Sequence, residues 1–90
     1  MRIFLQQKPA AGEAPRYFQL MLQQDLLGGW TLVRESGQLG GKVQLKREVF
    51  LEQSQAISAF EKARDLQIKR GFQIMFAEGA AKPGLGMGGS

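Results

Sequence analysis

Apolar and polar residues alternate through most of the first fifty positions, which is the pattern of β-strands that bury one face. In the clearest run, Phe18, Leu20 and Leu22 fall on one side, while Tyr17 and Gln19 fall on the other. A side-chain period of two is typical of a half-buried antiparallel strand. The sequence predicts four strands of this kind, over residues 2–7, 16–24, 30–36 and 42–50.

The same alternation predicts which side chains face the core. Ile3 and Leu5 share one side of the first strand, and Trp30, Leu32 and Arg34 share one side of the third. In the fourth strand we expect three side chains to face inward, with Arg47 interrupting their row at an edge or a bulge. These three are Val43, Leu45 and Val49.

The period changes to that of a helix between residues 52 and 70. A stripe of mostly apolar side chains recurs at helical spacing, and Gly71 is a suitable residue to end the helix. The stripe consists of Ala56, Ile57, Phe60, Ala63 and Gln67. A short final strand is expected over 72–76, with Phe72, Ile74 and Phe76 on one side.

Ninety residues make one domain. We expect an ordered domain over 1–78, followed by a disordered glycine-rich tail over 79–90. The fold class is α+β: an antiparallel sheet of four to five strands packed against one long C-terminal amphipathic helix.

Composition narrows the functional classes. Lys and Arg number 12 against 8 Asp and Glu, a net charge of +4 that permits contact with a polyanion. The absence of His and Cys removes the usual general base and the thiolate metal ligands, so we expect neither an enzyme nor a metal or cofactor site. No apolar run is long enough for a membrane span or a signal peptide, and the expected location is the cytoplasm.

Several segments together resemble a WGR domain. The residues that carry the likeness are 16–20 (RYFQL), 25–34 (DLLGGWTLVR), 35–40 (ESGQLG), and later Ala56, Ile57, Phe60, Gly71 and Phe72. WGR domains occur in poly(ADP-ribose) polymerases and in bacterial proteins, sometimes alone. The resemblance implies binding to DNA ends or breaks, in which a signature tryptophan packs on a terminal nucleotide and basic residues hold the backbone.

The signature itself differs in this chain. Ser36 stands where the family has tryptophan, and Gln38 stands where it has arginine, while Gly37, Leu39 and Gly40 match. Gln67 stands at a position that is often basic in the family's helix. Loss of one stacking contact and one charged phosphate contact would weaken DNA binding by roughly two orders of magnitude.

Two functions follow as hypotheses. One is weak, non-catalytic DNA binding through a basic face of the hairpin 30–50. The other is a protein-interaction or structural adaptor that has lost DNA binding, and the sequence leaves the oligomeric state open. The candidate nucleic-acid contacts are Trp30, Arg34, Ser36, Gln38, Lys42, Lys46 and Arg47.

The aromatic and basic candidates also have a structural interpretation. Trp30 could pack in the core instead of stacking on a base, and Arg34 could pair with Glu35 or Glu48 instead of a phosphate. The basic cluster 42–47 could be a solvated strand face.

Overall fold

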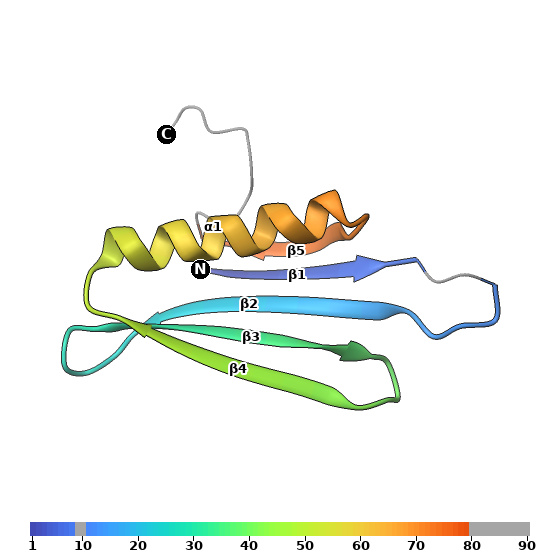
Figure 1. Ribbon diagram of the computed structural model, residues 1–90, viewed down its shortest axis with the longest axis horizontal. Helices are drawn as coiled ribbons and strands as arrows, with labels where there is room; N and C mark the ends of the chain where they lie inside the picture. Colours follow the sequence, from blue (N-terminus) through green and yellow to red (C-terminus); the bar gives the residue numbers. More distant parts are fainter. Residues whose placement is uncertain (9–10, 80–90) are drawn as a thin grey trace.

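The structure, a computed structural model, describes residues 1–8 and 11–79 and has one helix packed on one face of a five-stranded sheet (Figure 1). The α+β class expected from the sequence is confirmed. The elements are β1 (Arg2–Gln7), β2 (Arg16–Gln24), β3 (Trp30–Gln38), β4 (Val43–Phe50), α1 (Gln53–Lys69) and β5 (Gln73–Glu78). The expected disordered tail falls on residues outside the described ranges, apart from Gly79.

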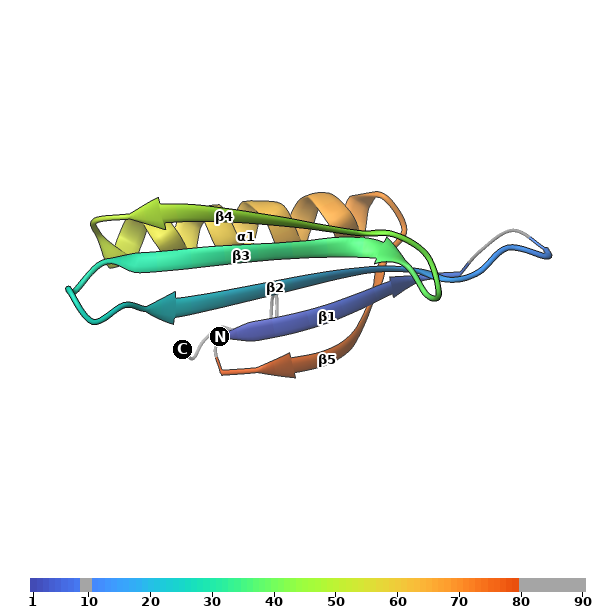
Figure 2. The ribbon, with the colours of Figure 1, turned by 90° about the horizontal axis from the view of Figure 1, so that it is seen from below.

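The strands lie in the order β4-β3-β2-β1-β5, and all neighbours are antiparallel. The first four strands form a meander. The helix then carries the chain back across the sheet, so that β5 pairs with β1 at the opposite edge from β4 (Figures 1 and 2). One crossing element therefore both covers a face and closes the sheet.

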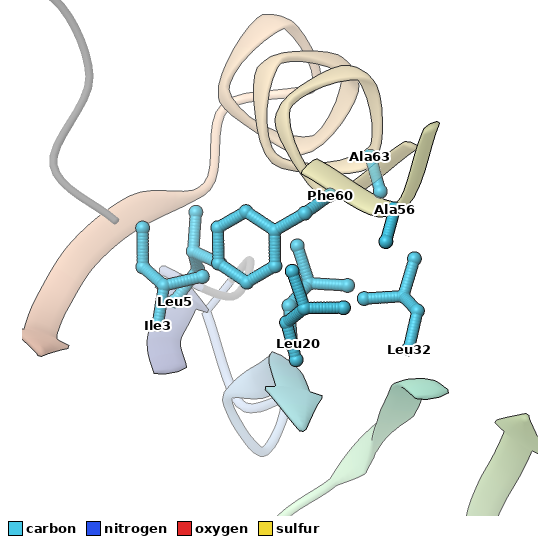
Figure 3. Packing of buried hydrophobic residues seen from close by; sticks show 8 residues of the cluster. Ile3, Leu5, Leu20, Leu32, Ala56, Phe60 and Ala63 are labelled. Atoms are coloured by element: carbon cyan, nitrogen blue, oxygen red, sulfur yellow. The ribbon is translucent and has the colours of Figure 1, made fainter. Parts of the chain in front are cut away.

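Side chains of directly paired residues point to the same side of a sheet. Ile3 pairs with Leu20, which pairs with Arg34, which pairs with Lys46, so these four form one row on the helix side. In this row the apolar residues Ile3 and Leu20 are buried beneath α1, whereas Arg34 and Lys46 lie toward the β4 edge. Phe60 of the helix is fully buried against side chains of β1, β2 and β3 (Figure 3).

The predicted inward positions of the first three strands and of the helix are largely confirmed. Leu20, Leu22 and Leu32 belong to the core, as do Ala56 and Ala63 on the helix. The helical stripe is wider than predicted because Arg64 is also buried, with its Nε donating to Asp65 Oδ1 at 2.9 Å.

The expected orientation of the fourth strand is wrong. Leu45 pairs with Glu35 and Val49 pairs with Thr31, which places their row on the side away from α1. Val43, Leu45 and Val49 are 55%, 52% and 65% exposed. The strand order makes β4 an edge strand. Its helix-side row is polar at Gln44, Lys46 and Glu48, and it ends in Phe50, which packs against the core.

The expectation that Phe72, Ile74 and Phe76 share one side of the last strand is also wrong, because Phe76 faces the opposite side of the sheet from Ile74. Leu5 pairs with Ile74, but Phe4 pairs with Phe76, so the register shifts by one residue at Met75. Ile74 packs against the core, while Phe76 lies 45% exposed on the open face beneath the guanidinium of Arg2, 5.1 Å from its ring centroid. A bulge re-aims the side chains that follow it.

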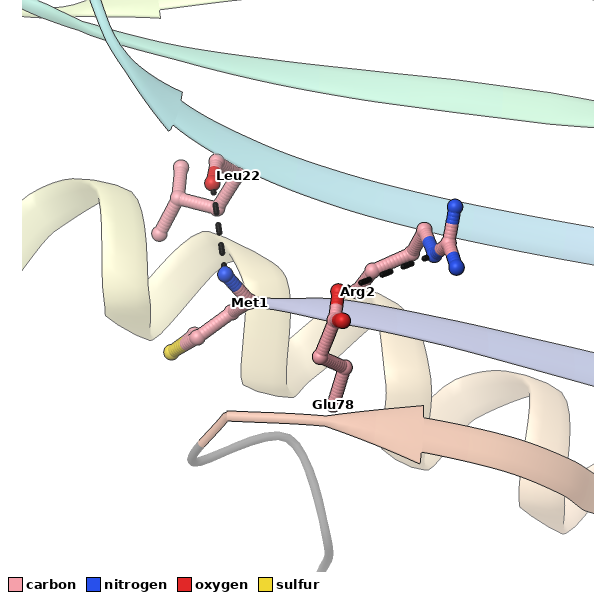
Figure 4. Close-up of polar contacts among 4 residues, drawn as sticks. All are labelled: Met1, Arg2, Leu22 and Glu78. Carbon is pink, nitrogen blue, oxygen red and sulfur yellow. Dashed lines mark hydrogen bonds and ion pairs between the residues drawn. The ribbon is translucent and has the colours of Figure 1, made fainter.

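Polar contacts hold the start of β1 to both of its neighbours (Figure 4). The amino group of Met1 donates to the carbonyl of Leu22 at 3.5 Å, and Arg2 Nε lies 3.9 Å from Glu78 Oε1. The first strand is therefore fixed at its N-terminal end by β2 on one side and β5 on the other. Within the described residues, no helix has the length and apolar character required to cross a membrane.

A matched pair of substitutions tests the orientation of β4. Leu32→Ala removes a fully buried side chain, and Leu45→Ala removes one that is 52% exposed on the adjacent strand. We expect Leu32→Ala to lower the free energy of unfolding by about 2–5 kcal/mol, because it leaves a cavity. Leu45→Ala should lower it by about 1 kcal/mol or less. Urea denaturation followed by circular dichroism measures both, and equal losses would contradict the described orientation.

Candidate nucleic-acid interface

A groove of about 690 Å³ lies where the C-terminal end of α1 meets the sheet beside the β3–β4 hairpin. Three basic side chains line it, from Arg16, Lys42 and Arg70. Among the residues that the structure describes, no Asp or Glu is part of its wall. A concave wall with cations and no carboxylate attracts anions, because the field of several like charges adds within it.

The three cations come from distant parts of the chain. Arg16 begins β2 and pairs with Gln38 at the end of β3, while Lys42 directly precedes β4. Arg70 caps α1, and its carbonyl accepts a 2.7 Å hydrogen bond from Gln7 Nε2. The sheet and the helix end thus bring together charges that the sequence separates.

Glycines shape two walls of the groove. A Cβ on Gly37 would lie 2.5 Å from the carbonyl oxygen of Lys42, so only glycine permits this close approach of β3 and β4. Gly71 has φ 95°, a left-handed conformation that ends α1 and turns the chain toward β5. The predicted role of Gly71 as the helix-ending residue agrees with this geometry.

Amide side chains supply neutral hydrogen-bonding groups to the same groove. Gln67 is the most notable because it is only 6% exposed and yet lines the groove. Within the described part of the chain, its side-chain amide makes no hydrogen bond. Its amide atoms are not fully closed off from solvent, so the group can hydrogen-bond a ligand that enters the groove.

Three of the sequence-predicted contacts meet in this groove, and the others lie elsewhere. Ser36, Gln38 and Lys42 line the groove. Arg34 and Lys46 pair directly on the helix side, where Arg34 Nη2 lies 2.9 Å from Glu48 Oε1. Of the two carboxylates that the sequence offers as partners for Arg34, Glu35 and Glu48, it is Glu48 that forms the ion pair.

The basic side chains of the hairpin do not all share one face of the sheet. Arg47 pairs with Val33 and points to the face away from the helix, opposite to Lys46. Adjacent residues in a strand project to opposite faces. The basic residues in 42–47 are close in sequence, but their charges are therefore divided between the two faces of the sheet.

Trp30 lies far from the groove. It begins β3, and Gln38 ends the same strand, so eight residues or ~26 Å of strand separate them. Trp30 is half-buried and packs against the core cluster. The structure thus supports the core interpretation of this residue.

A second, smaller hollow of about 320 Å³ lies across the hairpin, on the open face of the sheet. Its floor includes Phe4 and Tyr17, whose rings are stacked with centroids 5.8 Å apart. Tyr17 Oη donates to Glu35 Oε2 at 2.9 Å. This hydrogen bond raises the pKa of Tyr17 above its usual value of about 10, with smaller contributions from burial and from the charge of Glu35.

The sequence of this domain matches a known protein family. The structure defines a small α+β domain with a cationic groove beside a glycine-containing hairpin. The family model of the WGR domain matches residues 1–75, and the chain belongs to that family. Neither the curated proteins nor the solved structures give a significant match.

Sequence reasoning missed Arg16 and Arg70 as members of the site. In the sequence, Arg16 belongs only to a segment that resembles the family, and a basic residue at the end of a helix is usual for electrostatic reasons. The signal that could have found them is topological: the start of β2, the end of β3 and the end of α1 all lie at one end of the sheet.

The Tyr17–Glu35 contact can be tested by titration, because Tyr17 is the only tyrosine in the chain. We expect its phenol to ionise above pH 10 in the native protein. Glu35→Gln removes the carboxylate acceptor and its charge, and should move the midpoint down. Absorbance at the tyrosinate wavelength measures the midpoint, with circular dichroism as a check that the domain stays folded. An unchanged midpoint in Glu35→Gln would exclude the contact.

Proposed function

We propose that this WGR domain is a non-catalytic DNA-binding module whose groove receives the phosphate backbone near a duplex end. The observation that carries the proposal is the groove lined by Arg16, Lys42 and Arg70 without a carboxylate among the described residues. Basic side chains that neutralise phosphates release counterions, which supplies most of the free energy of non-specific DNA binding.

The geometry favours contact with the backbone over base reading. Arg16 and Arg70 can each donate two hydrogen bonds to one phosphate, and Lys42 acts as a point charge. The amides of Gln38 and Gln67 can donate to the remaining phosphate or sugar oxygens. Contacts of this kind position a duplex without specifying its sequence.

The proposed binding is weak because the signature positions are small or neutral. Ser36 and Gln38 line the groove at the positions where the family resemblance implies a stacking ring and a cation. The positive charge of the groove comes from Arg16, Lys42 and Arg70, and position 36 supplies no aromatic side chain.

Neutralising the groove should abolish most of the binding. We expect Lys42→Gln and Arg70→Gln each to weaken binding to a short blunt duplex about fivefold to tenfold at low salt. The matched control is Lys62→Gln, the same loss of charge at an exposed helix position outside the groove. Fluorescence anisotropy measures the dissociation constants. Equal effects of Lys42→Gln and Lys62→Gln would count against the groove.

Salt dependence gives an independent measure of the same contacts. Three phosphate contacts predict a slope of about −3 for log K against log salt concentration. Each groove variant should bring that slope about one unit closer to zero.

Restoring the signature should strengthen binding. Ser36→Trp with Gln38→Arg adds a ring and a guanidinium to the groove wall. We expect affinity for duplex ends to rise by roughly 100-fold, because stacking and a charged contact together contribute about 2–4 kcal/mol. The same anisotropy titration measures the gain. No gain in a folded double variant would show that this groove is not where the DNA end binds.

The second candidate function is a protein-interaction adaptor, and the open edge of β4 favours it. An edge strand offers unpaired backbone groups to a partner strand. Here that edge also carries the exposed side chains of Val43, Leu45 and Val49. A domain that binds no duplex at low salt but forms a dimer in light scattering would favour this function over DNA binding.

A further inference from the structure

The hollow on the open face has the features of a site for a flat ring. Phe4 and Tyr17 lie side by side on adjacent strands with their ring planes 25° apart. The hairpin turn, including Gly40 and Gly41, forms the other wall. No atom lies within 4 Å of the position that a Cβ on Gly40 would take, so the turn is open on that side.

Glu35 supplies the polar group of this hollow. It is the only charged side chain in the wall formed by the described residues. Its Oε2 accepts from Tyr17, which fixes the carboxylate, and the other oxygen makes no hydrogen bond with a described residue. A carboxylate can accept about four hydrogen bonds, so the group retains most of its capacity.

The hollow lies beside the cationic groove, but on the opposite face of the sheet. Tyr17 and Gln38 line both, and the β3–β4 hairpin separates them. For a base to reach Phe4 and Tyr17 while the terminal phosphates lie in the groove, the DNA strand must pass around the hairpin. Stacking of an unpaired base on an aromatic side chain contributes to binding in a way that every base allows.

We propose that this hollow binds an unpaired guanine next to the duplex end held by the groove, and the proposal rests on the function proposed above. The rings supply the stacking surface, and Glu35 accepts hydrogen bonds from the base. Guanine fits best because its ring N–H and its amino group are adjacent donors, which matches the two oxygens of a carboxylate. Thymine offers a single N–H donor on that edge.

A cationic side chain from a partner protein is the other chemistry that a carboxylate beside aromatic rings could bind. The surroundings favour the neutral base. Arg47 lies on the same open face, and the chain carries a net charge of +4, and both weaken the attraction of a cation to Glu35. The base, in contrast, arrives attached to phosphates that the groove attracts.

The test compares DNA ligands that differ only in the unpaired bases. One duplex is prepared blunt and with two-nucleotide overhangs of guanine, thymine or abasic residues. We expect the guanine overhang to bind the native protein about fivefold or more tightly than the abasic overhang, with thymine between them. The abasic overhang carries the same phosphates, so this difference measures the contribution of the base. Fluorescence anisotropy at fixed salt gives the dissociation constants.

Variants on the open face assign the effect to the hollow. Phe4→Leu keeps an apolar side chain but removes one ring, and Phe4 does not line the groove. We expect it to lose the advantage of guanine over the abasic overhang while retaining affinity for the blunt duplex. Glu35→Gln should reduce the preference for guanine over thymine. Phe76→Leu is the matched control, because Phe76 is an aromatic residue of the same face outside the hollow, and it should behave as the native protein.

The outcomes separate this proposal from the function on which it rests. A guanine overhang that binds no better than an abasic one, or no better than thymine, would overturn the guanine site while leaving the groove intact. That result would leave a cationic side chain as the better ligand for the hollow. Failure of every duplex to bind at low salt would instead overturn the groove, and the guanine site with it. Circular dichroism of each variant confirms that the domain remains folded.

Discussion

The packing of one helix against the middle of one sheet is the constraint from which the rest of the molecule follows. Phe60 is the largest fully buried side chain, and it packs with residues of β1, β2 and β3. A single helical stripe covers only a few strands, about 10 Å of width. The open face and the outer strand β4 therefore remain largely exposed. The hollow lies on that open face, while the groove lies at the C-terminal end of the helix, where Gln67 and Arg70 line it.

The same packing assembles the charges of the groove. Because α1 must cross from the β4 edge to the β5 edge, its C-terminal end lies above the strand ends that carry Arg16 and Gln38. Arg70 and Lys42 complete the wall from opposite sides. No local segment of the sequence contains this set of cations, so the site depends on the topology of the whole domain.

The sequence predicts this fold well because the spacing of apolar residues clearly distinguishes the strands from the helix. That spacing does not say which face of a strand points toward the core. In β4 the residues Val43, Leu45 and Val49 share a face, as alternation requires, and that face is the exposed one. The polar row with Lys46 and Glu48 lies on the helix side, at the outer edge of the sheet. The sequence does not predict that Arg16 and Arg70 lie together, for a related reason: proximity across a sheet is set by strand pairing and not by spacing along the chain.

The two hollows also explain how a degenerate signature is compatible with the function proposed here. Ser36 and Gln38 leave the groove without the ring and the guanidinium that the family resemblance implies, while its charge comes from three other residues. Across the hairpin, Phe4 and Tyr17 present stacked rings beside a carboxylate. If the proposed guanine site is correct, the aromatic contact lies on the open side of the hairpin instead of its helix side. Charge on one side would attract any duplex, and stacking on the other would favour an end with an unpaired base. This division would make the domain a reader of frayed or overhanging ends, because a blunt end would fill only the groove.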